Sequence, residues 1–181
     1  MSLPNLISLA RLLCVPLPIW FILNGHFTAA FWMFVAAGLS DGIDGFIAKR
    51  FDQRSELGAL LDPIADKALI VSMYVTLGLA GYLPSWLVIL VVFRDLLIIG
   101  GFLLAAAVTQ PMRWEPLAIS KINTALQLIL LATLLARLGL SLEDHGIIRG
   151  LVYIVGATTI LSGAGYLVRW ARGLAGVGLD P

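Results

Sequence analysis

The 181-residue sequence is poor in charged residues: Asp, Glu, Lys and Arg make up 13% of it, about half the share found in a typical soluble domain. The charges nearly cancel, with 12 basic and 11 acidic residues, so no strongly basic surface predicts nucleic acid as a partner. The single cysteine, Cys14, excludes an internal disulfide, and its apolar neighbours predict a buried small side chain. These shortages exclude a disulfide scaffold and a disordered chain, and they disfavour a soluble fold.

Hydrophobic residues, in contrast, make up 60% of the chain, and the mean hydropathy is +0.96. Six stretches have the roughly 20 apolar residues that cross a membrane as a helix. They cover residues 6–23, 27–48, 57–80, 84–108, 117–138 and 147–169, with Gly, Asn or Pro in most of the breaks between them. We therefore expect an all-α polytopic membrane protein, a bundle of six transmembrane helices, with the first helix kinked at Pro16 and Pro18.

The arrangement of basic residues predicts which side of the membrane the termini occupy. Six spans put both termini on one side, and that side would carry Lys49, Arg50, Arg54, Arg113, Arg169 and Arg172. The other side would carry only Arg137 and Arg149, so the positive-inside rule predicts cytoplasmic termini. No cleavable targeting segment is evident, and a multi-pass protein of a bacterial cytoplasmic membrane is expected. Residues 1–172 would form the transmembrane domain, and the Gly-rich residues 173–181 a flexible tail.

Four aspartates interrupt the second and third apolar stretches. Asp41 and Asp44 are three residues apart, and Asp62 and Asp66 are four apart, so each pair lies on one helical face. Each aspartate within a membrane costs about 2.5–3.5 kcal/mol on the insertion scale, so the four together would offset most of a domain's stability of about 5–15 kcal/mol. Convergent carboxylates suit hard divalent cations such as Mg²⁺ or Mn²⁺, and two ions about 4 Å apart would clamp a phosphoryl group.

The spacing of these acids with small residues resembles the signature of the CDP-alcohol phosphatidyltransferases. The matching pattern is Asp41-x2-Asp44-Gly45-x2-Ala48-Lys49-x8-Gly58-x3-Asp62-x3-Asp66. The family usually has arginine where this chain has Lys49, with Arg50 next to it, so either side chain could contact the substrate phosphates. The six-span plan extends the resemblance to nearly the whole chain.

The resemblance implies a metal-dependent transferase with its active site facing the cytoplasm. Asp41, Asp44, Asp62 and Asp66 would bind two Mg²⁺ or Mn²⁺ ions, and Asp66 would also be the catalytic base for the acceptor hydroxyl. CDP-diacylglycerol, the donor, would be held by Pro4, Asn5, Leu6, Ile7, Gly45, Ala48, Lys49, Ser55 and Gly58. The family resemblance also implies a homodimer.

Polar residues in the later spans are candidates for binding the acceptor. Four of them are assigned to acceptor binding: Arg94, Lys121, Asn123 and Thr124. Arg94 could instead be a member of a structural ion pair, and Lys121 a residue that reaches the membrane interface. Arg94 and Asp95 are adjacent and point to different sectors of the helix, so each is expected to need its own partner. Lys67 is expected to support the acidic cluster.

The identity of the acceptor is predicted from three stretches, around Asp62, Arg94 and Lys121, that resemble the CDP-diacylglycerol-dependent cardiolipin synthases. The related phosphatidylglycerophosphate synthases typically have a second lysine at the position of Asn123. Phosphatidylglycerol carries one negative charge and needs fewer cations than glycerol 3-phosphate. We therefore expect cardiolipin and CMP as products, with glycerol 3-phosphate as the alternative acceptor. A cation channel or transporter with an acidic intramembrane site is the alternative from another functional class.

Overall fold

The computed structural model describes residue 10 and residues 12–51, 56–107 and 117–177, and it describes side chains at residues 10, 12–40, 67–101 and 117–170. Within these ranges the chain is helical, without a strand. The helices are α2 (Pro16–Leu23), α3 (Phe27–Phe51), α4 (Glu56–Leu79), α5 (Ser85–Ala107), α6 (Ala118–Leu140) and α7 (Ile147–Val177). The all-α prediction is therefore confirmed for the described residues.

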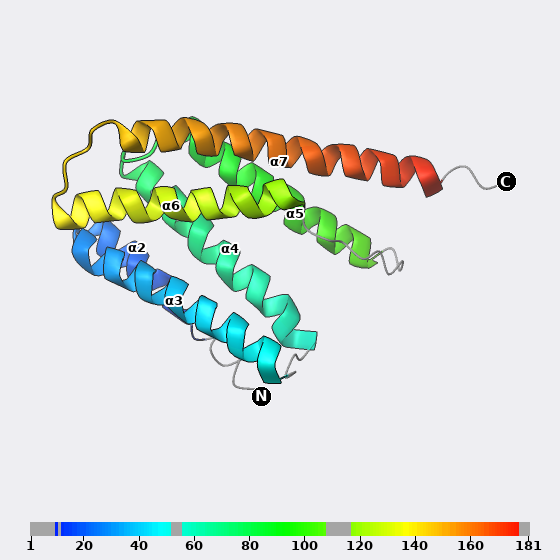
Figure 1. Cartoon of the computed structure of the whole chain (residues 1–181), viewed down its shortest axis with the longest axis horizontal. Coiled ribbons are helices and arrows are strands. Elements are labelled where there is room, and N and C mark those ends of the chain that lie inside the picture. Colours follow the sequence, from blue (N-terminus) through cyan, green and yellow to red (C-terminus); the bar gives the residue numbers. More distant parts are fainter. Residues whose placement is uncertain (1–9, 11, 52–55, 108–116, 178–181) are drawn as a thin grey trace.

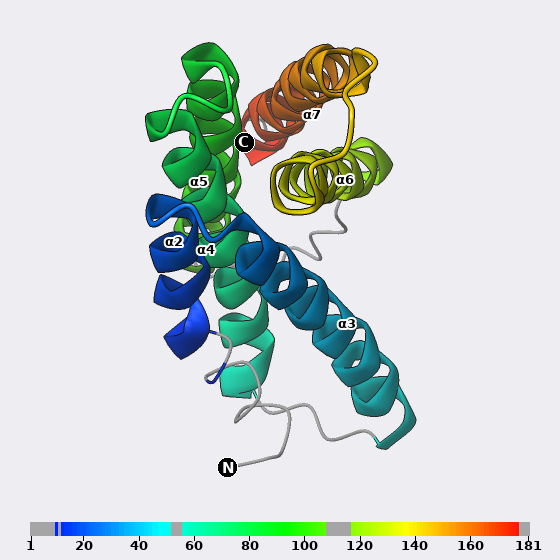
Figure 2. The ribbon, with the colours of Figure 1, turned by 90° about the vertical axis from the view of Figure 1, so that its left-hand side faces the viewer.

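The helices form one bundle in which α6 and α7 run side by side (Figure 1). Helix α6 also packs against α3 and α4, and α5 packs against both α4 and α7. Helix α2 packs against both α3 and α4. Figure 2 shows α4 and α5 on one side of the bundle and the α6–α7 pair on the other. The C-terminal part of α7 extends beyond the other helices (Figure 1).

The helix ends follow from local sequence. The first apolar stretch is interrupted at Val15, directly before Pro16. This break is expected because proline has no backbone N–H to donate a hydrogen bond to the preceding helical turn. Helix α2 ends where Asn24 Nδ2 donates to the carbonyl of Trp20 at 2.8 Å, and Gly25 follows with a φ of 74° that favours glycine. Helix α7 begins after Asp144, whose carboxylate accepts bonds from the amides of Gly146 and Ile148, at 3.0 and 3.3 Å.

Helices α3 and α6 approach each other closely at one point. The Thr28 hydroxyl donates to the carbonyl of Gly139 at 2.6 Å. A methyl group added at Gly139 would lie 2.8 Å from the backbone nitrogen and Cα of Thr28, so only glycine fits there. This contact resembles the small-residue interfaces by which helices pack in membranes.

The bundle has apolar side chains both in its core and on its outer surface. Large apolar side chains face outward, including Ile89, Phe93 and Leu96 on α5 and Ile160 and Leu161 on α7. Among the described side chains, the buried polar ones are Thr76, Arg94, Asp95, Ser120, Asn123, Gln127, Thr159 and Ser162. Apolar surface of this extent is unfavourable in water and suited to lipid. Two of the described helical segments, Ala118–Leu140 and Ile147–Trp170, are long and apolar enough to cross a membrane.

The structure differs from two expectations, the burial of Cys14 and the start of the C-terminal tail. Cys14 is exposed, so the prediction of a buried cysteine is wrong: its apolar neighbours in sequence do not specify which side of the helix faces the core. Helix α7 continues to Val177, and it therefore includes the first five residues of the segment 173–181 that was expected to be a flexible tail. Helices α3, α4, α5 and α6 begin and end within three residues of the predicted stretches, whereas α2 begins only at Pro16 of the stretch predicted at 6–23.

Candidate functional site

The four aspartates of the motif lie on α3 and α4, near the segment that connects these helices. Asp41 and Asp44 belong to the C-terminal half of α3, and Asp62 and Asp66 to the N-terminal half of α4. The C-terminal end of α3 and the N-terminal end of α4 lie on the same side of the bundle (Figures 1 and 2). The side chains of all four lie outside the described part of the structure. The helical backbone supports the expectation that each pair shares one face.

The chemistry of this donor set fits a hard divalent cation. All four groups are carboxylates, and Mg²⁺ and Mn²⁺ prefer oxygen ligands. The described side chains themselves contain no group of three His, Cys, Asp or Glu residues that could hold a metal. The assignment of a metal site to the four aspartates stays a prediction.

The residues assigned to the CDP-lipid fall into two groups. Gly45, Ala48 and Lys49 lie on α3 and Gly58 on α4, in the same helical segments as the acids, although their side-chain surroundings are not described. The other five assigned residues lie outside the described residues: Pro4, Asn5, Leu6, Ile7 and Ser55. Their assignment stays a prediction.

A buried ionic network begins one residue after Asp66. Lys67 Nζ donates to Asp95 Oδ1 at 2.9 Å, and Arg94 Nη1 donates to the same oxygen at 2.5 Å. Arg94 also donates to Ser162, from Nε at 3.2 Å and from Nη2 at 2.9 Å, and Nη2 bonds the hydroxyl of Ser120. Arg94 and Asp95 are 2% and 1% exposed, and Lys67 is 19% exposed. The network therefore joins four helices, α4, α5, α6 and α7, around one carboxylate.

This geometry corrects one expectation about α5. Arg94 and Asp95 were expected to need separate partners, because adjacent helical residues point in different directions. They pair with each other, since the long arginine side chain carries its guanidinium back to the carboxylate. Asp95 Oδ1 accepts from both cations, while Oδ2 is buried without a hydrogen-bond partner among the described residues.

A second polar group lies further along α6. Asn123 Oδ1 accepts bonds from Thr158 and Thr159 of α7, at 2.7 and 3.0 Å. Tyr74 of α4 donates to the backbone carbonyl of Gln127 at 3.3 Å. The amide nitrogen of Asn123 and both amide atoms of Gln127 are buried and have no partner within the described part of the chain. Polar side chains therefore continue from the ionic network into the bundle interior.

The four residues assigned to the acceptor have different surroundings. Arg94 and Asn123 are buried and bonded to neighbouring helices, as described above, and the Thr124 hydroxyl donates to the carbonyl of Ser120 at 3.1 Å. Lys121 is exposed. Sequence reasoning did not identify Thr158, Thr159 and Ser162, although their spacing of three and four residues on an apolar helix was a usable signal of a polar face.

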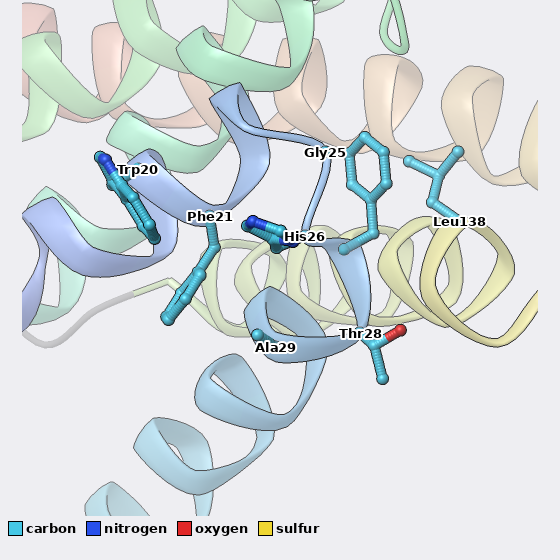
Figure 3. A pocket seen from close by; sticks show the side chains of 8 residues that line it. Trp20, Phe21, Gly25, His26, Thr28, Ala29 and Leu138 are labelled. Atoms are coloured by element: carbon cyan, nitrogen blue, oxygen red, sulfur yellow. The ribbon is translucent and has the colours of Figure 1, made fainter.

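Two cavities border α3. The first has a volume of about 230 Å³ and is enclosed by α3, by α4 and by the segment that precedes α2. It is lined by Cys14, Ala37, Leu69 and Ser40, and Ser40 directly precedes Asp41. The other, of about 540 Å³, lies beside the turn between α2 and α3, where Trp20, Phe21 and His26 border it (Figure 3). The second cavity is at the opposite end of α3, roughly 20 Å from the aspartates at 1.5 Å per residue, so only the first adjoins the motif.

Comparison with known proteins gives a family match over most of the chain. Residues 1–166 match the model of the CDP-alcohol phosphatidyltransferases, and this range contains all four aspartates. The human cardiolipin synthase (CMP-forming) is 38% identical over 75% of this chain and 50% of its own length. A fission-yeast protein, a cardiolipin synthase (CMP-forming) / mitochondrial hydrolase fusion protein from Schizosaccharomyces pombe, is 36% identical over 92% of this chain and 31% of its own length.

A relative with a different named activity is similar to the same extent. The rice chloroplastic CDP-diacylglycerol–glycerol-3-phosphate 3-phosphatidyltransferase 1 is 35% identical over 95% of this chain and 58% of its own length. The chain thus spans between 31% and 58% of the length of these three relatives. The relatives therefore carry two different named activities, cardiolipin synthase (CMP-forming) and CDP-diacylglycerol–glycerol-3-phosphate 3-phosphatidyltransferase.

Proposed function

Since this chain belongs to the CDP-alcohol phosphatidyltransferase family, we propose that it transfers a phosphatidyl group from CDP-diacylglycerol to phosphatidylglycerol, giving cardiolipin and CMP. The observation that carries the proposal is the family match over residues 1–166, which includes every acid of the motif. The relatives from human and fission yeast, both named cardiolipin synthases (CMP-forming), support this acceptor.

In the proposed reaction the acceptor hydroxyl attacks the β-phosphorus of the donor. Asp66 takes the hydroxyl proton, the new phosphorus–oxygen bond forms, and the bond to CMP breaks, so that the electron pair leaves on the CMP phosphate. Asp41, Asp44, Asp62 and Asp66 would hold two divalent cations, which would neutralise the diphosphate charge. Transfer at phosphorus depends mainly on such neutralisation and on positioning.

The donor would lie along α3 and α4. We assign its diphosphate and nucleotide to Pro4, Asn5, Leu6, Ile7, Gly45, Ala48, Lys49, Ser55 and Gly58. The cavity beside Ser40 is lined mainly by apolar side chains and adjoins the motif, so we assign one acyl chain of the donor to it. A volume of about 230 Å³ is enough for part of such a chain.

The acceptor would approach from α6. Lys121 is the exposed cation among the four assigned residues, and we propose that it contacts the single phosphate of phosphatidylglycerol. The other three residues would form the inner wall of the acceptor site, because each is hydrogen-bonded within the bundle: Arg94, Asn123 and Thr124.

We further propose that the chain crosses a bacterial cytoplasmic membrane six times, with cytoplasmic termini and active site, and forms a homodimer. The outward-facing apolar side chains and the buried Arg94–Asp95 pair support a lipid environment. Helix α7 would be about 45 Å long at 1.5 Å per residue, longer than the roughly 30 Å hydrocarbon core. It would therefore extend out of the membrane at its C-terminal end. A mass measurement in nanodiscs tests the homodimer, and a monomer there would contradict it.

A second candidate is transfer to glycerol 3-phosphate, which the named activity of the rice relative favours. The class of reaction is tested by mixing the purified protein with CDP-diacylglycerol, Mg²⁺ and each acceptor, and by measuring CMP. Release of CMP with either acceptor supports a transferase. No release with any acceptor alcohol, combined with ion flux in proteoliposomes, would favour the channel or transporter alternative.

A further inference from the structure

We propose that Asp95 is a positioning residue for the acidic motif, acting through Lys67; this inference rests on the proposed function. Asp95 is on α5 and belongs to none of the residues assigned to metal, donor or acceptor. Its carboxylate holds the side chain of the residue that directly follows Asp66, the proposed base, in α4.

The Lys67–Asp95 contact restrains α4 against α5 at the turn that follows Asp66. Lys67 Nζ lies 2.9 Å from Asp95 Oδ1, and Asp95 itself is 1% exposed, so the carboxylate cannot move without disturbing the core. Adjacent helical residues are separated by about 100° around the axis. A bond from Lys67 to α5 therefore limits rotation of the adjacent α4 turn that carries Asp66.

The anchor is itself held from three helices. Arg94 donates to the same Oδ1 at 2.5 Å and is bonded to Ser120 of α6 and Ser162 of α7. Asp95 thus links the α4 turn after Asp66 to the part of the bundle that carries the acceptor residues. A shift of the carboxylate would change the separation between base and acceptor.

Charge gives Asp95 a role that an uncharged group could not replace. Lys67 and Arg94 are two cations that bond one oxygen of Asp95, directly after the α4 turn that carries Asp66. Without the Asp95 charge, Lys67 and Arg94 would repel each other across one oxygen, and the contact between Lys67 and Asp95 would weaken. A weaker contact would let Asp66 depart from the productive geometry, where a displacement of about 1 Å can cost about 100-fold in rate.

The test compares Asp95→Asn and Lys67→Met, alone and combined, with the unmodified chain in membrane-mimetic detergent. Asparagine keeps an oxygen that can accept the lysine bond and removes only the charge. We expect kcat for CMP release to fall at least about 10-fold in each single variant, with the donor KM changed by less than about 3-fold. The Mg²⁺ concentration for half-maximal rate should rise, and the double variant should be no slower than the slower single variant.

Two further variants separate positioning from general stability. Thr76→Val removes another buried polar group of α4, whose hydroxyl bonds only its own helix among the described contacts, at 2.7 Å to the carbonyl of Ser72. It should leave kcat and the Mg²⁺ requirement unchanged. Lys67→Arg, which keeps the charge and a donor toward Asp95, should recover most of the rate lost in Lys67→Met.

The outcomes are distinct. A folded Asp95→Asn protein with unchanged kcat and Mg²⁺ requirement, while the unmodified chain releases CMP, overturns the positioning role and leaves the transferase assignment intact. Multiplicative losses in the double variant also overturn it, since the two residues would then act independently. No CMP from the unmodified chain would refute the proposed function, and the positioning role with it.

Discussion

Replacement of Arg94 by lysine tests whether this arginine is a structural residue or binds the anionic acceptor. In the structure its guanidinium reaches Asp95, Ser120 and Ser162 at 2% exposure. Lysine keeps the charge and can keep the contact to Asp95, but one ammonium group cannot also reach both serines.

The magnitude follows from the bonds that are lost. Interhelical hydrogen bonds in membranes average about 0.6 kcal/mol and reach about 1.7 kcal/mol. The loss of two or three bonds to the serines therefore lowers the free energy of unfolding by about 1–3 kcal/mol. Arg94→Met also leaves the Asp95 carboxylate with one cation fewer, and breaking a buried pair costs about 3–5 kcal/mol. The stability order should be unmodified chain, then lysine, then methionine.

The assay is thermal unfolding in mild detergent, combined with the acceptor KM. For a chain of this length each 1 kcal/mol shifts the Tm by about 2–4 °C, so Arg94→Lys should unfold several degrees lower while the KM for phosphatidylglycerol changes little. An unchanged Tm together with a strongly raised acceptor KM would refute the structural role and show that Arg94 binds the acceptor.

Four other variants or treatments give expected outcomes. Asp66→Asn should abolish CMP release while donor binding is partly retained, because the amide cannot accept the proton; wild-type turnover would place the base elsewhere. Excess chelator should stop the reaction and added Mg²⁺ should restore it, whereas turnover in chelator would contradict the metal site. Gly139→Ala should lower the Tm, because the methyl group would meet the Thr28 backbone at 2.8 Å, while Gly150→Ala, with nothing within 4 Å, should not; equal Tm values would refute the close packing. Alkylation of Cys14 with a long-chain maleimide should raise the donor KM, and an unchanged KM would remove the acyl chain from this cavity.

The helices were predictable because hydrophobic length and turn residues specify them almost alone. The stretch predicted at 27–48 corresponds to Phe27–Phe51, and the break in the first stretch follows from the fixed φ and missing amide of Pro16. The acidic motif was equally readable, since aspartates in apolar helices are costly and their spacing is periodic.

The contacts within the bundle could not be predicted in the same way. Lys67 and Asp95 are 28 residues apart, and Arg94 and Ser162 are 68 apart, so only the packing of α4, α5 and α7 brings them together. The pairing of Arg94 with Asp95 depends on a rotamer that sequence spacing does not encode. Cys14 was misjudged because an apolar stretch of sequence does not specify which side of the helix faces the core.

The most direct test of the central claim is the product formed from each acceptor. The purified chain would be given CDP-diacylglycerol and Mg²⁺ with either phosphatidylglycerol or glycerol 3-phosphate, and the lipids would be identified by mass spectrometry. We expect cardiolipin and an equal amount of CMP from phosphatidylglycerol. Phosphatidylglycerophosphate from glycerol 3-phosphate, with no cardiolipin from phosphatidylglycerol, would contradict the proposed acceptor.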